Sequence, residues 1–259
     1  MASTLTLQQL SIGYHLKRNQ LRVIAPAMNI SLRANELTCL IGPNGVGKSS
    51  LLKTIAGFLP PLDGTILLHN KKLSEYSPQE MAKEISVVLT SKVYTELTVF
   101  DIVGMGRAPY TGFWGTLSAE DKQMVADAIL STGISHLAER NILELSDGER
   151  QKVMIAKALA QQTSLIILDE PTAFLDYPSK VETLLMLRRL AHEQHKSILL
   201  STHDVELALQ LSDHLWLMEE NKLAIGTPRE LADNGALSHF IERKGIHFDK
   251  EKLRIEVDG

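Results

Sequence analysis

A glycine-rich octapeptide has the residue types needed to surround phosphate groups. It reads, in order, Gly42, Pro43, Asn44, Gly45, Val46, Gly47, Lys48 and Ser49. Its glycines let successive backbone N–H groups turn toward phosphate oxygens without Cβ clashes. The lysine can reach the β- and γ-phosphates of a nucleotide, and the final serine hydroxyl can ligate Mg²⁺. An apolar run precedes the octapeptide and a helix pattern follows it, so we expect a nucleotide site, with Ser50 beside it, rather than a plain turn.

Two adjacent carboxylates follow another apolar run. Residues 165–168, LIIL, predict a buried strand that ends in Asp169 and Glu170. Asp169 would hold Mg²⁺ directly or through water, and Glu170 would polarise the water that attacks the γ-phosphate. Apolar runs that end in acids are common, so this pair gains its meaning from the octapeptide upstream.

A third segment, LSDGER at residues 145–150, precedes a helix pattern. Ser146 supplies a hydroxyl, and Gly148 permits close approach of another group. The helix N-terminus brings partial positive charge that suits an anion. Taken alone, the segment is equally a helix cap with a common serine.

The elements that must position these groups alternate between strand and helix. Strand patterns cover residues 37–41, 65–69, 85–89, 165–168 and 198–200, and helix patterns start at 47, 118, 148 and about 181. This alternation predicts a mainly parallel sheet with crossover helices. Strand patterns are missing from about 95 to 160, which predicts a helical insertion. Residues 216–218 and 223–225 predict a final strand pair, and Thr227 with Pro228 and Glu230 predicts a capped last helix.

Composition excludes several classes of protein. The chain has 259 residues, a formal charge of −4 and 44% hydrophobic residues, which is typical of globular rather than disordered or fibrous chains. The acidic balance argues against nucleic-acid binding through a large basic surface. The single cysteine, Cys39, lies in an apolar run and is expected to be buried. Neither a transmembrane-length apolar stretch nor a signal-peptide pattern is present, so we expect a cytoplasmic protein.

The ordered set of motifs resembles the ABC-transporter ATPases over essentially the whole chain. The segment Leu145, Ser146, Asp147, Gly148 and Glu149 resembles their LSGGQ signature. Residues 173–176, ending in Asp176, resemble their D-loop, and residues 201–204 around His203 resemble their switch-histidine loop. Tyr14 stands at the place of their adenine-stacking aromatic residue. Residues 102–110 and 145–152 look most like importers of iron(III)-siderophores, haem and cobalamin.

The resemblance implies a RecA-like α/β P-loop core with an antiparallel β element and an inserted helical subdomain. Residues 1–94 and 161–259 would form the core and residues 95–160 the signature subdomain of a single domain, 1–259. It implies ATP and Mg²⁺ as ligands, with Glu170 and His203 catalytic. Two copies would pair head to tail, and ATP hydrolysis would drive separate transmembrane permease subunits. A substrate-binding protein would take part indirectly, and the chain would lie on the cytoplasmic face of the membrane.

Two residues depart from the family pattern. Thr90 stands where a glutamine is usual, with Ser91 as a substitute one position on, and Asn35 replaces the usual glycine before Glu36. Asparagine tolerates a left-handed backbone, so the second change should be mild. Tyr110, Phe113 and Trp114 either pack the helical insertion or receive a helix from a membrane partner.

Three other functions fit less of the sequence. A soluble ABC ATPase in translation or DNA repair would carry two ATPase units or long coiled coils, and neither pattern is present. A P-loop kinase would leave residues 145–150 unexplained. A nucleotide-binding regulator without activity would not need intact Lys48, Asp169, Glu170 and His203.

Overall fold

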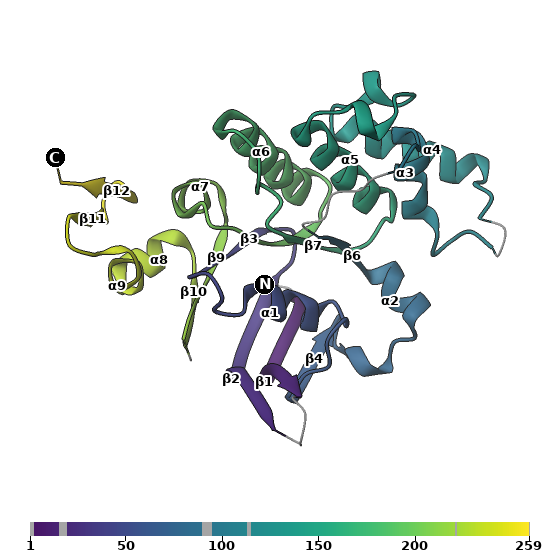
Figure 1. Cartoon of the computed structure of the whole chain (residues 1–259). Helices are drawn as coiled ribbons and strands as arrows, with labels where there is room; N and C mark the ends of the chain where they lie inside the picture. Colours follow the sequence, from purple (N-terminus) through teal and green to yellow (C-terminus); the bar gives the residue numbers. More distant parts are fainter. Residues whose placement is uncertain (1–2, 16–19, 90–94, 113–114, 221, 259) are drawn as a thin grey trace.

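The main layer of the molecule is a six-stranded sheet, seen nearly edge-on in Figure 1. The structure is a computed structural model that describes residues 3–15, 20–89, 95–112, 115–220 and 222–258. The strand order is β10-β9-β3-β8-β7-β6. The strands are β3 (Leu37–Ile41), β6 (Ile85–Val88), β7 (Leu165–Asp169), β8 (Ser197–Ser201), β9 (His214–Glu219) and β10 (Lys222–Gly226). All neighbours are parallel except β9 and β10, so the fold is the expected α/β class.

The central strands are buried on both faces, which explains their unbroken apolar runs. Leu40, Ile167 and Leu199 face one side, where they pack with residues of α1 (Lys48–Ile55). Cys39, Ile166 and Leu200 face the other, where they pack with residues of α6 (Tyr177–Glu193) and α7 (Val205–Leu211). The side-chain alternation of each strand therefore fills two cores.

A second, antiparallel sheet covers α1 on the side away from the main sheet (Figure 1). Its order is β2-β1-β4-β5, formed by β1 (Ser3–His15), β2 (Leu21–Arg33), β4 (Asp63–Leu68) and β5 (Lys71–Lys72). The strand expected at 65–69 begins earlier and ends at Leu68, because His69 and Asn70 adopt left-handed φ angles of 49° and 66°.

Helices gather at the β6 end of the main sheet (Figure 1). They are α3 (Val99–Gly104), α4 (Ala119–Ser131) and α5 (Asp147–Ala160), with 3₁₀ turns at Met105–Arg107, Ser135–Leu137 and Ile142–Glu144. Ser118 caps α4 as expected. The buried Arg107 guanidinium joins the turn after α3 to α4 and α5, since it donates to Asp121 at 2.8 Å and to the carbonyl oxygen of Ala160 at 2.8 Å. The described residues between 95 and 160 form no strand, only an isolated bridge from Thr98 to Asn141.

The remaining elements lie at the edges. The 3₁₀ turn Leu73–Glu75 and α2 (Pro78–Glu84) connect β5 to β6, and α8 (Pro228–Asp233) carries the predicted capping box of Thr227 and Glu230. α9 (Ala236–Ile241) and the hairpin β11 (Ile246–Asp249) and β12 (Arg254–Val257) complete the chain. Among the described residues, every helix is too short or too polar to cross a membrane.

Candidate nucleotide site

The phosphate-binding loop lies at the carboxyl end of β3. It turns directly into α1, whose N-cap is Gly47 with a left-handed φ of 114°. A Cβ at this position would overlap the side chain of Ile24, so the turn requires glycine. Asn35, before β3, also adopts a left-handed φ of 62°, as its tolerance predicted.

Lys48 is folded back over this loop. Its Nζ donates to the carbonyl oxygens of Gly42 at 2.8 Å and Pro43 at 3.1 Å. Burial lowers the pKa of the ammonium, although the carboxylates of Glu170 and Asp169 oppose that shift. A phosphate group placed over the loop would give this cation a stronger acceptor than the two carbonyls.

Ser49 and Asp169 come together at the adjoining strand end. The Ser49 hydroxyl donates to Oδ1 of Asp169 at 3.0 Å, across 120 residues of chain. A hydroxyl and a carboxylate are hard oxygen ligands of the kind that Mg²⁺ takes together with phosphate and water oxygens. The pair therefore fits a Mg²⁺ ion that is bound together with a nucleotide. The described residues contain no group of three or more acidic, histidine or cysteine side chains that could hold a metal ion.

Glu170 and His203 meet at the ends of neighbouring strands β7 and β8. Nε2 of His203 lies 2.6 Å from Oε1 of Glu170. Glu170 has a left-handed φ of 50°, and its N–H donates to the Ser201 hydroxyl at 2.9 Å. The side chain of His203 is 44% exposed and that of Glu170 is 30% exposed, so both can reach a ligand on this edge.

Tyr14 borders the phosphate loop from the antiparallel sheet. Its hydroxyl lies 2.8 Å from the Ser50 hydroxyl in the first turn of α1. The side chain is 38% exposed, which leaves ring surface for a stacked base. The structure therefore brings Tyr14 and Ser50 to the same edge as the loop, as expected from their places in the sequence.

The signature segment lies elsewhere. Ser146 is the N-cap of α5, and its hydroxyl accepts from the N–H of Glu149 while Glu149 accepts from the N–H of Ser146. The Ser146 N–H and, second, the Ser146 hydroxyl both donate to the Glu149 carboxylate, and these two bonds lower the pKa of Glu149. Figure 1 places α5 above the main sheet and α1 below it, so in the described part of one chain this segment does not join the phosphate loop.

The other predicted residues have varied surroundings. Asp176 is the N-cap of α6, and hydrogen bonds from the Ser179 hydroxyl and from the Ser179 N–H at 3.1 Å lower the pKa of its carboxyl. Tyr110 packs over the Arg107 guanidinium, 4.0 Å from ring centroid to Cζ, so it supports the helices. Thr90, Ser91, Phe113 and Trp114 lie outside the described residues.

Two sets of side-chain contacts at this edge could not be predicted from the sequence. Ser201 is fully buried, and its hydroxyl also donates to Oδ1 of Asp169 at 2.7 Å. Asp204 accepts from Lys180 at 3.0 Å and from Thr172 at 3.2 Å. Only the fold brings these residues together, since between 24 and 32 positions separate the partners.

The fold and the site define a P-loop nucleotide-binding protein. Residues 26–173 match the ABC transporter family model, and the chain belongs to that family. It is 39% identical over 214 residues to the iron(3+)-hydroxamate import ATP-binding protein of Bacillus subtilis, covering 82% of this chain and 78% of that one. It is 32% identical over 226 residues to the ferric enterobactin transport ATP-binding protein of Escherichia coli, covering 86% and 82%.

A further relative and a solved structure agree. An uncharacterized ABC transporter ATP-binding protein of Methanocaldococcus jannaschii is 40% identical over 248 residues, 95% of this chain and 84% of the relative. A chain of an ABC transporter in an inward-facing conformation superposes with a TM-score of 0.78 at 27% identity, covering 99% and 97% of the two chains. The protein is thus an ATP-binding subunit whose ATPase activity is coupled to transport.

Proposed function

We propose that this chain is the ATP-hydrolysing subunit of an importer for an iron(III)-siderophore, haem or cobalamin. The convergence of Ser49, Asp169, Glu170 and His203 at one sheet edge carries the catalytic part of this proposal. Relatives named for iron(3+)-hydroxamate, achromobactin, petrobactin and ferric enterobactin transport support the cargo class.

In this proposal Glu170 accepts the proton of the attacking water. The water oxygen bonds to the γ-phosphorus as the bond to the bridging oxygen breaks, which yields ADP and phosphate. Glu170 must first leave its 2.6 Å contact with His203, whose imidazole then donates to a γ-phosphate oxygen. Lys48 turns from its two carbonyls to the phosphates. Mg²⁺ held by Ser49 and Asp169 would offset the phosphate charge.

A second copy would complete the site. In each chain α5 packs on one face of the sheet and α1, which follows the phosphate loop, packs on the other, so we do not expect one copy to enclose ATP with both its loop and its α5 N-terminus. In a head-to-tail dimer, Ser146 and Gly148 of one copy would face the ATP on the loop of the other. ATP would then hold the dimer closed, and hydrolysis would reopen it.

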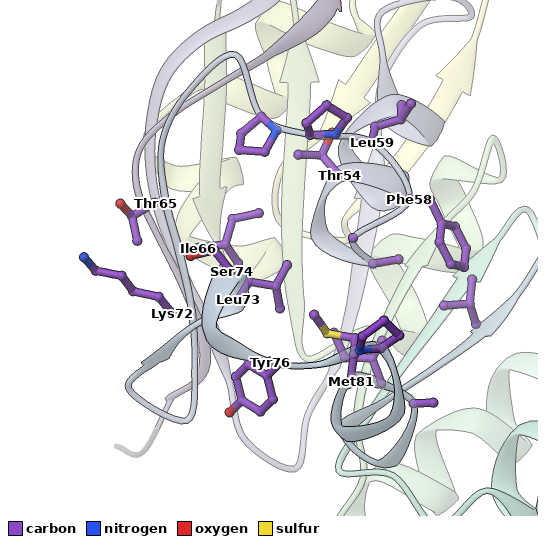
Figure 2. Close-up of a pocket in the computed structure, with 18 of the residues that line it drawn as sticks. Thr54, Phe58, Leu59, Thr65, Ile66, Lys72, Leu73, Ser74, Tyr76 and Met81 are labelled. Carbon is purple, nitrogen blue, oxygen red and sulfur yellow. The ribbon is translucent and has the colours of Figure 1, made fainter. Parts of the chain in front are cut away.

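A hollow of about 780 Å³ is the proposed docking place for a permease helix. Figure 2 shows Phe58 and Leu59 after α1, and Met81 from α2, around it. Leu73, Tyr76 and Val87 add apolar surface, and Phe58 is 57% exposed. Val87 lies on β6, which precedes the segment at residue 90. Because β6 pairs with β7, a helix bound in this hollow would contact a strand that ends next to the carboxylates after β7.

Uptake measurements test the function and the cargo together. In cells that lack this gene, the wild-type chain should restore accumulation of a labelled ferric siderophore, haem or cobalamin, and Lys48→Ala should not. Failure to restore any of the three, with the chain recovered on ribosomes rather than with membranes, would reject the proposal.

A further inference from the structure

We propose that Lys180 and Asp204 form a brace that holds His203 in position beside Glu170 for hydrolysis. The inference rests on the proposed function, in which those two side chains contact the γ-phosphate and the attacking water. Lys180 and Asp204 would contact neither, so they are positioning residues.

The loop that carries His203 needs such support. It spans residues 202–204, between β8 and α7, and the His203 side chain is 44% exposed. An exposed imidazole has few packing neighbours, so its place depends on the backbone that bears it. On the strand side this backbone is fixed, since the Thr202 N–H donates to the Leu40 carbonyl oxygen at 3.1 Å.

Asp204 supplies the support on the helix side. It is the N-cap residue of α7, where an aspartate commonly accepts from the first N–H groups of the helix. Here its side chain makes no such bond. Oδ1 accepts instead from Nζ of Lys180 at 3.0 Å, and Oδ2 accepts from the Thr172 hydroxyl at 3.2 Å.

These two partners flank the segment that follows Glu170. Thr172 lies two residues after Glu170 and is 2% exposed, and Lys180 lies in the first turns of α6, which begins after Asp176. Asp204 therefore links the His203 loop to both ends of the connection between β7 and α6. The Lys180 and Asp204 side chains are 24% and 29% exposed, so solvent only partly screens their charges.

Loss of the Lys180 charge should free one oxygen of Asp204. That oxygen can then turn to the N–H groups at the start of α7 and shift the loop before it. The phosphate loop at residues 42–49 lies outside the brace, so ATP binding should not change. The brace therefore predicts a fall in kcat with a constant KM for ATP.

The first experiment measures ATP hydrolysis by the full chain. Lys180→Met should lower kcat at least threefold and leave KM within twofold, while Lys180→Arg should keep more than half of the wild-type kcat. The control is Glu182→Gln on the same helix, which breaks the 3.2 Å ion pair with Lys152 and should leave kcat unchanged. A smaller loss in Lys180→Met, or an equal loss in Glu182→Gln, would overturn the brace.

A double-mutant cycle shows whether Lys180 acts through His203. The background is His203→Ala, whose slow turnover is followed with radiolabelled ATP. There Lys180→Met should lower kcat by less than a further twofold. If it lowers kcat by as much as it does in the wild-type chain, the proposal is contradicted. Glu170→Gln distinguishes failure of the proposed function from failure of the brace. If this variant hydrolyses ATP at the normal rate, the proposed function is wrong. If its hydrolysis stalls while Lys180→Met hydrolyses ATP normally, only the brace is wrong.

Discussion

Replacement of Ser201 by alanine should weaken both the fold and the catalytic edge. The side chain is fully buried at the end of β8. Its hydroxyl donates to Asp169 at 2.7 Å and accepts from the N–H of Glu170 at 2.9 Å. It thus fixes the proposed Mg²⁺ ligand and the left-handed backbone of the proposed general base with one atom.

The magnitude follows from the two bonds. A hydrogen bond to a charged group contributes about 1.5–3 kcal/mol and a neutral one about 0.5–1.5 kcal/mol. Ser201→Ala should therefore lower the free energy of unfolding by about 2–4.5 kcal/mol. For a chain of this size that is a fall in Tm of roughly 4–18 °C. Release of the Glu170 backbone should also lower kcat at least tenfold, since small displacements of a catalytic group cost up to about 100-fold.

Ser197→Ala is the matched control. Ser197 is a buried serine on the same strand, and its hydroxyl lies 2.6 Å from the Thr4 hydroxyl and 3.3 Å from the N–H of Asn35. Urea unfolding and steady-state ATP hydrolysis of both variants separate stability from positioning. We expect both variants to lose stability and only Ser201→Ala to lose kcat. Equal kcat in the two variants, or a loss of less than about 0.5 kcal/mol in Ser201→Ala, would show that the Ser201 hydroxyl does not hold Asp169 and Glu170 in place.

Three further predictions concern the loop, the signature and the core. Lys48→Ala should weaken ATP binding at least tenfold by calorimetry, because it removes the cation that faces the phosphates. Ser146→Arg should leave ATP affinity of the isolated chain within twofold but abolish ATP-dependent dimers in gel filtration; a loss of affinity equal to that of Lys48→Ala would show that the site is not shared between copies. Burial raises the pKa of the Cys39 thiol from 9.0 to about 12, so iodoacetamide at pH 8 should label it only after unfolding. As pH rises from 9 toward 12, the thiol ionises in the unfolded chain before it ionises in the folded one, so the free energy of unfolding falls. In urea unfolding, Cys39→Ala should therefore lose less stability over this pH range than the wild-type chain.

The sequence predicted those parts of the fold that have a clear local residue pattern. The short apolar runs of β3, β7 and β8 predicted buried strands, and the octapeptide at 42–49 predicted a helix after the first of them. β1 and β2 were harder to see. Register shifts, with left-handed φ angles at Gln9 and Ala27, break the alternation that marks a long strand.

The sequence predicted the motif residues of the site but not the tertiary contacts that hold them in position. Glu170 and His203 could be placed at strand ends, but their 2.6 Å contact depends on β7 and β8 being neighbours in the sheet. Asp204 is the N-cap residue of α7, and the turn of its side chain toward Lys180 depends on where α6 lies against that loop. Contacts of this kind arise from tertiary structure, and no local spacing encodes them.

The most direct measurement is ATP turnover by Glu170→Gln in the presence of the membrane partner. The variant should bind ATP, hydrolyse it about 10²–10⁴-fold more slowly, and accumulate as an ATP-bound dimer, because a neutral amide cannot accept the proton of water. Near-normal turnover would contradict the assignment of Glu170 as the general base, and with it the catalytic account of this site.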